Sequence, residues 1–184
     1  MPEVSDGAPD PQEGRIGASD CERLRPGLVA QPVNTVTSLG YVVAGAVVMA
    51  RHHQGDLGRR RQVRLYSSML ALVGLGSVAF HGPQPPGARA MHDLPIPALL
   101  VLAIGTPLIR ARRGEAALPG WTRRRGGTLA AMTAAGLSTY AGGRTGAPSC
   151  DPDSPIQLHG AWHLLSASNF IRVADIIYGR TSDG

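Results

Sequence analysis

The stretch LYSSMLALVGLGSVAFH, residues 65–81, decides the fold, because it holds no charged side chain before its final histidine and predicts a helix that is apolar on nearly every face. Helices on the surface of soluble proteins instead carry charge along one face. Four more apolar segments lie before and after it in the sequence, at residues 32–50, 94–109, 128–140 and 156–178. We expect an all-α bundle of about five transmembrane helices, although several segments are shorter than the roughly 20 residues that a spanning helix needs.

Average composition favours the alternative, a soluble helical bundle, since the mean hydropathy is -0.02. That average conceals a segregation, because residues 1–26 hold no apolar run and are rich in proline, glycine and acid. The apolar segments are rich in small residues, which close helix packing in lipid favours. We expect residues 1–26 to form a polar, disordered or loosely held tail outside the membrane, and residues 27–180 to form a single transmembrane domain.

The arginines predict the orientation in the membrane. All 18 basic residues are arginine, and most of them lie in two alternate loops, whereas the other two loops hold only Arg89 and Arg144. This alternation follows the positive-inside rule, so the N-terminus should lie outside and the C-terminus in the cytoplasm. The runs have no interleaved aromatic residues, so a nucleic-acid partner is not expected. The predicted cytoplasmic loops contain Arg51, Arg59, Arg60, Arg61 and Arg64, and Arg110, Arg112, Arg113, Arg123, Arg124 and Arg125.

Three histidines are the candidate metal ligands. His81 ends the stretch at residues 65–81, and His159 and His163 are spaced to share one face of the last helix. The expected topology places all three in the outer third of the membrane, where ionisable side chains are costly and signal function by default. Three neutral imidazoles and one water would complete a tetrahedral catalytic zinc site, provided that the three meet. His52 and His53 fall in an arginine-rich loop, where we expect them to be solvated.

Further polar residues lie near these histidines, and each has a structural alternative to a functional role. Ser77, one turn before His81, either bonds the carbonyl one turn back or supports an oxyanion beside the metal. Asp93 is either a carboxylate favoured by a helix dipole or a general base. His92 and Asp93 are adjacent and project in different directions, so we expect only one to face the site and prefer Asp93. His92 is the alternative metal ligand.

The two cysteines both fall on the predicted outer side. Cys21 lies in the N-terminal segment, and Cys150 lies in the loop before the last apolar segment. Disulfides persist in such oxidising surroundings. We expect a Cys21–Cys150 disulfide, and the alternative is two unrelated thiols.

Several motifs resemble those of a known family. The sequences GLGSVAFHG (74–82), HDLP (92–95) and HGAWHLLSA (159–167) resemble the three motifs of the alkaline ceramidase family, in the wider CREST group of membrane hydrolases. The stretch CERLRPGLVAQPVNTVTS (21–38) is similar to the family's N-terminal segment. The resemblance implies zinc ligands His81, His159 and His163, with Ser77 and Asp93 as polar partners of zinc and its water. It also implies the Cys21–Cys150 bridge and hydrolysis of the amide bond of ceramides.

The chain departs from the family pattern in two respects. The family has seven membrane helices, so this chain resembles a shortened version that lacks a helix pair between His81 and His159. The resemblance also implies that Asp20 and Glu22 are remnants of a calcium site. Gln31 stands where that site needs a carboxylate, so we expect activity without calcium.

Together, these observations predict an integral-membrane zinc-dependent hydrolase that cleaves the amide bond of ceramide-like N-acyl lipids. Its partner would be a membrane lipid substrate, and its location a bacterial plasma membrane, because many Ala, Gly and Arg residues without Lys are typical of high-GC genomes. The alternative is a receptor-like or structural module whose zinc is not catalytic. A fourth protein ligand such as His92 would favour that alternative, and an open zinc position would favour an enzyme.

Overall fold

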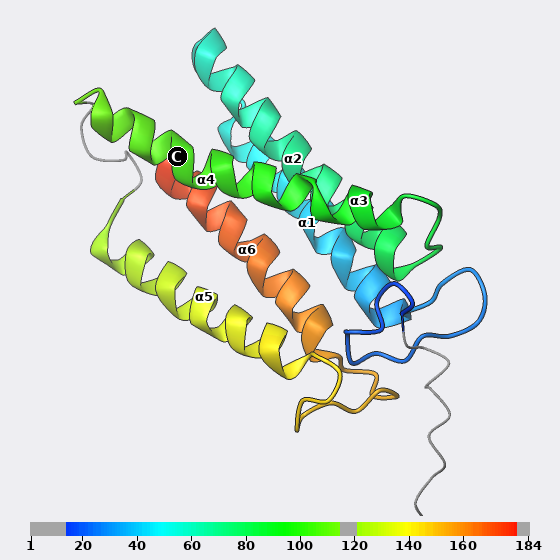
Figure 1. The fold of residues 1–184 in the computed structure, drawn as a ribbon. Coiled ribbons are helices and arrows are strands. Elements are labelled where there is room, and N and C mark those ends of the chain that lie inside the picture. The colour runs from blue at the N-terminus through cyan, green and yellow to red at the C-terminus, as the bar shows by residue number, and fades with distance from the viewer. Residues whose placement is uncertain (1–13, 115–120, 180–184) are drawn as a thin grey trace, which may run out of the picture.

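The computed structural model describes residues 14–114 and 121–179 of the 184-residue chain. These residues form five long helices and one short helix, with no strand among them (Figure 1), so the predicted all-α bundle is confirmed. The predicted apolar segments fall almost wholly within the long helices. The helices are α1 (Pro32–His52), α2 (Leu57–His81), α3 (Ala88–Asp93), α4 (Pro95–Arg112), α5 (Arg123–Gly142) and α6 (Leu158–Tyr178).

Two helices begin earlier than their apolar residues because polar caps start them. The Asp56 side chain accepts a hydrogen bond from the backbone N–H of Arg59, so α2 begins at Leu57. Thr122 caps α5 in the same way through the N–H of Arg125. Such caps satisfy N–H groups that the first helical turn leaves without partners. The arginines that follow are good helix formers, so these helices extend beyond the segments that hydropathy marked.

Close packing of α1 against α2 and α6 forms the centre of the bundle, with α4 beside α2 and α5 beside α6 (Figure 1). Gly45 and Gly74 allow the closest approach of α1 to α2. A Cβ on Gly45 would lie 2.7 Å from the carbonyl oxygen of Ser67, and one on Gly74 would lie 2.7 Å from Val42. Small residues at such contacts are typical of helices that pack in lipid.

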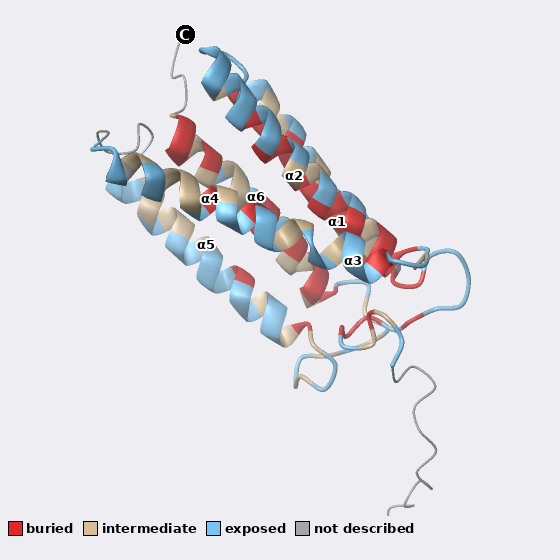
Figure 2. Ribbon diagram, turned by 45° about the horizontal axis from the view of Figure 1, so that its top comes forward, coloured by how far each residue is buried: buried red, intermediate tan, exposed pale blue. Residues whose placement is uncertain are grey.

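Figure 2 shows which residues of the bundle are buried and which are exposed. The polarity of these two groups is partly reversed relative to a soluble protein. Buried polar side chains occur inside it, among them Asn34, Ser38 and Ser77, while Val43 and Val101 are 60% and 69% exposed. Three stretches are long and apolar enough to cross a membrane, namely Pro32–His52, Leu57–His81 and Ala88–Arg110. The chain therefore has the character of a membrane protein. By the same measure, α5 and α6 are not among the candidate spans in the described part of the chain.

The N-terminal segment, defined here as residues 14–31, packs against one end of the bundle. Its residues Asp20, Cys21, Glu22 and Leu24 are buried. The expectation of a loose tail is therefore wrong for residues 14–26, and residues 1–13 lie outside the described residues. The cause is a polar contact that hydropathy does not register: the Glu22 carboxylate accepts the backbone N–H groups of Val33 and Asn34 at the start of α1.

The predicted disulfide between Cys21 and Cys150 is confirmed. It ties the N-terminal segment to the loop between α5 and α6. Backbone and side-chain contacts reinforce this link, because Cys21 donates its N–H to the Gly143 carbonyl and Thr145 donates its hydroxyl to the Ala18 carbonyl. An exposed ion pair of Arg23 with Asp153 spans the same junction.

Replacing Cys150 with serine is expected to lower the melting temperature of the purified protein by about 5–15 °C. The bond joins residues separated by 129 positions, and disulfides that close long loops commonly contribute about 2–4 kcal/mol to the free energy of unfolding. Thermal unfolding in detergent, with and without reductant, measures the effect. Reductant should lower the melting temperature of wild type and leave that of the variant unchanged. Equal melting temperatures of wild type and Cys150→Ser in the absence of reductant would contradict a stabilising role of the disulfide.

At the opposite end of the bundle, His52 differs from its expected state. It is 1% exposed, and its Nε2 lies 2.9 Å from Oδ1 of Asp175 on α6. The expectation that His52 is solvated is wrong, because α1 continues to His52 and turns its ring toward α6. His53, the next residue, is exposed as expected.

Candidate metal centre

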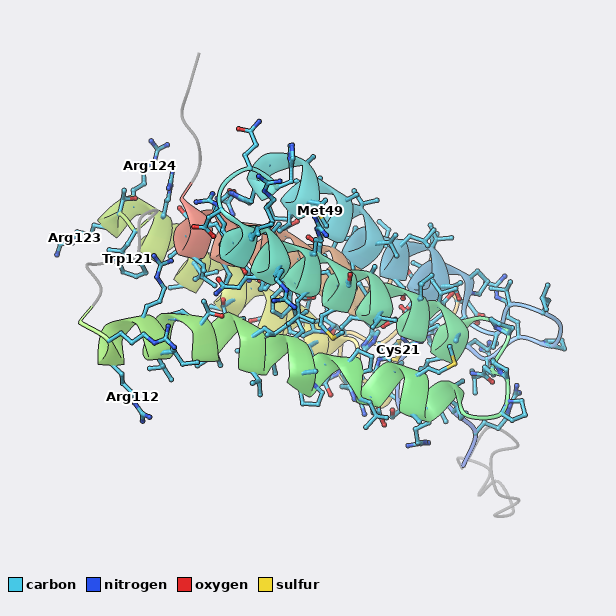
Figure 3. All side chains as sticks on the ribbon, turned by 90° about the horizontal axis from the view of Figure 1, so that it is seen from above. Cys21, Met49, Arg112, Trp121, Arg123 and Arg124 are labelled. Atoms are coloured by element: carbon cyan, nitrogen blue, oxygen red, sulfur yellow. A yellow bond between two sulfur atoms is a disulfide. The ribbon has the colours of Figure 1, made fainter. Side chains whose placement is uncertain are left out.

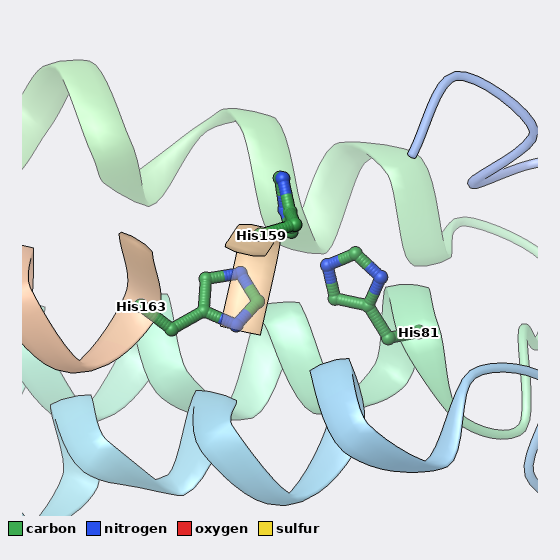
Figure 4. A group of neighbouring side chains, drawn as sticks. All are labelled: His81, His159 and His163. Atoms are coloured by element: carbon green, nitrogen blue, oxygen red, sulfur yellow. The ribbon is translucent and has the colours of Figure 1, made fainter. Parts of the chain in front are cut away.

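His81, His159 and His163 meet inside the bundle, as the sequence predicted (Figure 4). His81 is the last residue of α2, and the other two lie one turn apart at the start of α6. All three are buried, and their ring centroids are separated by 4.7–5.3 Å. One nitrogen from each ring lies within 4.8 Å of the other two, so the group could hold a metal ion.

Hydrogen bonds on the outer side of two rings fix how they face the centre. His81 Nδ1 lies 2.6 Å from Gln31 Oε1, and His163 Nδ1 lies 3.2 Å from the Thr37 hydroxyl and 3.3 Å from that of Ser38. The opposite nitrogen of each ring is then directed inward. Metal-binding histidines are commonly held in this way by a partner on their second nitrogen.

Two buried nitrogens test whether the group fits a metal. Within the described residues, His81 Nε2 and His159 Nδ1 are buried without a hydrogen-bond partner. Leaving such an atom unsatisfied costs about 1–3 kcal/mol, so its persistence calls for a reason. For His81 Nε2, a lone pair directed at a cation provides one, whereas His159 Nδ1 lies 3.5 Å from the Asp20 carboxylate. Three imidazoles are also a known ligand set of catalytic zinc, so the residues fit the zinc that the sequence predicted.

The acid nearest to these rings is Asp20, from the N-terminal segment. Its Oδ1 lies 3.5 Å from His159 Nδ1 and its Oδ2 lies 3.9 Å from His81 Nδ1. Burial raises the pKa of the Asp20 carboxyl to about 6, and the ion pair with Arg144, at 2.9 Å, opposes that rise. Sequence reasoning treated Asp20 only as a calcium-site remnant. The signal that could have found it is its position beside Cys21, whose disulfide joins this segment to the loop before His159.

Glu22, the other expected remnant of a calcium site, lies at the start of α1. Both its oxygens accept backbone N–H groups at 2.8 Å, from Val33 and Asn34. A carboxylate is favoured at a helix N-terminus, where N–H groups lack partners. Asp20 and Glu22 therefore have partners within the protein, and activity without calcium stays a prediction.

His92 and Asp93 both line the cavity beside the histidines, so the expectation that only one would face the site is wrong. His92 Nδ1 lies 2.7 Å from Asp93 Oδ1, and the His92 ring packs against Phe80 at 4.5 Å between centroids. Both residues belong to α3, which lies directly on α2 because Gly76 leaves room for the Met91 carbonyl. His92 is not among the three histidines whose nitrogens converge.

Ser77 lies where the sequence placed it, buried and one turn before His81. It lines a cavity of about 470 Å³ together with His159, His163, His92 and Asp93. Apolar side chains of α2, α4 and α6 form one part of the remaining lining, and Asp20, Arg89 and Arg144 add charged groups to it. A second, mostly apolar cavity of about 480 Å³ shares Leu100, Trp162 and Phe170 with the first. The two cavities therefore adjoin, with the polar histidine end at one extreme and apolar side chains of α4, α5 and α6 at the other.

Comparison of the chain with protein-family models, with curated proteins and with solved structures finds no match. The geometry of the site and the sequence motifs therefore carry the functional argument.

Proposed function

We propose that the chain is an integral-membrane zinc hydrolase that cleaves the amide bond of a ceramide-like N-acyl lipid. The observation that carries this proposal is that three buried histidines converge, and that two of them, His159 and His163, line a cavity that shares side chains with a second, mostly apolar cavity. An amphipathic lipid has the matching form, with a polar amide at one end and a hydrocarbon chain at the other. The motif resemblance to the alkaline ceramidase family supports the same substrate class.

The residues around the cavity divide the chemistry among them. Zinc, when bound by three imidazoles, supplies a Lewis acid and lowers the pKa of a water molecule to about 7. The Ser77 hydroxyl can donate a hydrogen bond to the oxyanion that develops when the amide carbonyl is attacked. Asp93, bonded to His92, can accept a proton and return it to the leaving amine.

The apolar cavity would hold the acyl chain. It is lined by Ile104 and Leu108 of α4, by Leu129 of α5, and by Val173 and Ile177 of α6. The connection between α4 and α5 falls where the resemblance implies a missing helix pair. A chain bound there would lie between helices whose outer faces expose apolar side chains, so a lipid could enter sideways from the membrane.

The orientation in the membrane is part of the proposal. Arg112, Arg123 and Arg124 lie at one end of the bundle and Cys21 at the other (Figure 3). Five crossings with the arginine-rich end in the cytoplasm would place the disulfide and the histidines near the outer face. Such an arrangement fits a bacterial plasma membrane with the N-terminus outside and the C-terminus inside.

The competing function is a receptor-like or structural module whose zinc only links helices. A closed structural zinc site has four protein ligands. Among the described residues, the converging group holds three histidines. Asp20, whose Oδ1 lies 3.5 Å from His159 Nδ1, is engaged by an ion pair with Arg144 at 2.9 Å. The cavity beside His159 and His163 leaves space for substrate. This combination favours the hydrolase.

A panel of lipid amides and esters, presented in liposomes, tests the function. We expect zinc-loaded protein to release fatty acid from short-chain or unsaturated ceramides or another N-acyl lipid, because zinc held by the three histidines would supply an activated water beside the cavity. Protein stripped with a chelator should be inactive, and zinc without calcium should restore release. If no lipid separates loaded from stripped protein, the zinc-linked module becomes the better account.

A further inference from the structure

Gln31 is fully buried beside His81, and both ends of its side chain are engaged. Its Nε2 lies 3.0 Å from the Gly17 carbonyl oxygen and 2.8 Å from that of Glu22. Its Oε1 lies 2.6 Å from His81 Nδ1. The backbone is held as well, since Gln31 donates its N–H to the carbonyl of His81 at 2.7 Å. The residue therefore joins the N-terminal segment to the last turn of α2.

The partners of the Gln31 amide determine which way it points. Backbone carbonyl oxygens only accept hydrogen bonds, so the group that faces Gly17 and Glu22 must be the NH₂, which donates two. The amide oxygen is then directed at His81. An amide oxygen only accepts, so the proton between them belongs to His81 Nδ1.

A neutral imidazole carries one proton, so a proton on Nδ1 leaves the lone pair on Nε2. His81 Nε2 is one of the buried nitrogens that have no hydrogen-bond partner among the described residues. It belongs to the ring whose neighbours are the His159 and His163 rings, at 5.3 and 5.1 Å between centroids. We propose that Gln31 is a positioning residue that holds His81 in the Nδ1–H tautomer and directs its Nε2 lone pair at the metal.

This role rests on the metal site of the proposed function, and it accounts for an amide rather than a carboxylate at this position. A glutamate side chain could accept a hydrogen bond from His81 Nδ1, but it has no N–H to donate to the carbonyl oxygens of Gly17 and Glu22. Its second oxygen would lie against two carbonyl oxygens in a buried place, where unpaired polar atoms are costly. The amide satisfies all three partners at once.

Gln84 provides a matched control. Its Nε2 also donates to two backbone carbonyls, those of Ile16 and Phe80, at 2.9 and 3.0 Å. It therefore ties the same N-terminal segment to the end of α2. Within the described part of the chain, its amide makes no hydrogen bond to His81, His159 or His163. A variant of Gln84 therefore tests the anchoring of the segment without changing the orientation of the imidazole.

The test compares Gln31→Met with Gln84→Met in the purified full-length protein in detergent. Zinc affinity is measured by competition with a chelator, and the His81 tautomer in the metal-free protein by NMR of ¹⁵N-labelled histidine, assigned with His81→Ala. Gln31→Met should weaken zinc binding about 10- to 100-fold, as loss of a partner on a ligand imidazole does. It should also abolish the preference for Nδ1–H. Gln84→Met should change affinity by less than about threefold and keep the tautomer.

Each outcome decides the proposal without any substrate. Equal losses of affinity in the two variants, or unchanged affinity in Gln31→Met, would overturn it. If Gln31→Met does not fold, the wild-type spectrum decides, because a proton on Nε2 of His81 contradicts the role of Gln31. A wild type that binds no zinc but shows Nδ1–H at His81 would refute the proposed hydrolase and support the orienting contact. Gln31→Glu, which keeps an acceptor for His81, should retain the wild-type tautomer, and a switch to Nε2–H there would count against the proposal.

Discussion

Replacing His163 with alanine is expected to abolish metal binding, taking zinc content from about one ion per chain to nearly none. Two imidazoles remain in this variant, and two ligands bind zinc far more weakly than three. His81→Ala and His159→Ala should have the same effect, since each removes one member of the converging group. Elemental analysis after dialysis against a mild chelator measures the metal content directly.

His52→Ala is the matched control for this series. His52 is also a buried histidine in a long helix, and it bonds Asp175 at the other end of the bundle. Its loss should reduce stability and leave zinc bound. A folded His52→Ala protein without zinc, beside a His163→Ala protein that keeps it, would show that the metal site has been assigned to the wrong histidines.

Asp93→Asn is expected to keep zinc and reduce the turnover of N-acyl lipid by about 10²- to 10⁴-fold, the usual contribution of a general acid or base. An amide cannot take up the proton that the carboxylate accepts. The Asp93 side chain is 56% exposed at the cavity, so its loss should leave the fold unchanged. Turnover and zinc content are measured on the same preparation.

Asp153→Asn is the comparison variant for Asp93→Asn. Asp153 is an exposed acid at the same end of the bundle, paired with Arg23. Its replacement should leave turnover within about twofold of wild type, because surface ion pairs contribute little to a fold. Loss of zinc in Asp93→Asn would show that Asp93 is a metal ligand. Undiminished turnover would show that another group acts as the general base.

The helices and the three histidines could be predicted because they depend on local patterns. Apolar segments of suitable length predict buried or lipid-facing helices, and a spacing of four residues places His159 and His163 on one face. The convergence with His81 followed from the alternating direction of the helices, which the arginine distribution indicated. Each inference uses only the order of residues along the chain.

Asp20, Gln31 and His52 could not be assigned in this way, because their roles depend on contacts between distant segments. The Glu22 carboxylate at the start of α1 holds the N-terminal segment in place, and that fold-back brings Asp20 and Gln31 to the histidines. Hydropathy registers such a segment only as polar. The opposite error occurred at His52, where a loop was expected, because α1 continues for two more residues and directs the His52 ring at Asp175.

Under the proposed function, the residues that would bind metal lie largely apart from those that would contact hydrocarbon. The converging histidines come from α2 and α6, and their hydrogen-bond partners come from α1 and the N-terminal segment. The helices α4 and α5 line the cavities, and α5 adds one ring contact, between Tyr140 and His159. Helices gained or lost between α4 and α5 could thus alter which chain lengths are accepted without disturbing a single ligand. In evolutionary terms, reactivity and selectivity could vary independently, and a short chain could keep the chemistry of a longer one while accepting smaller molecules.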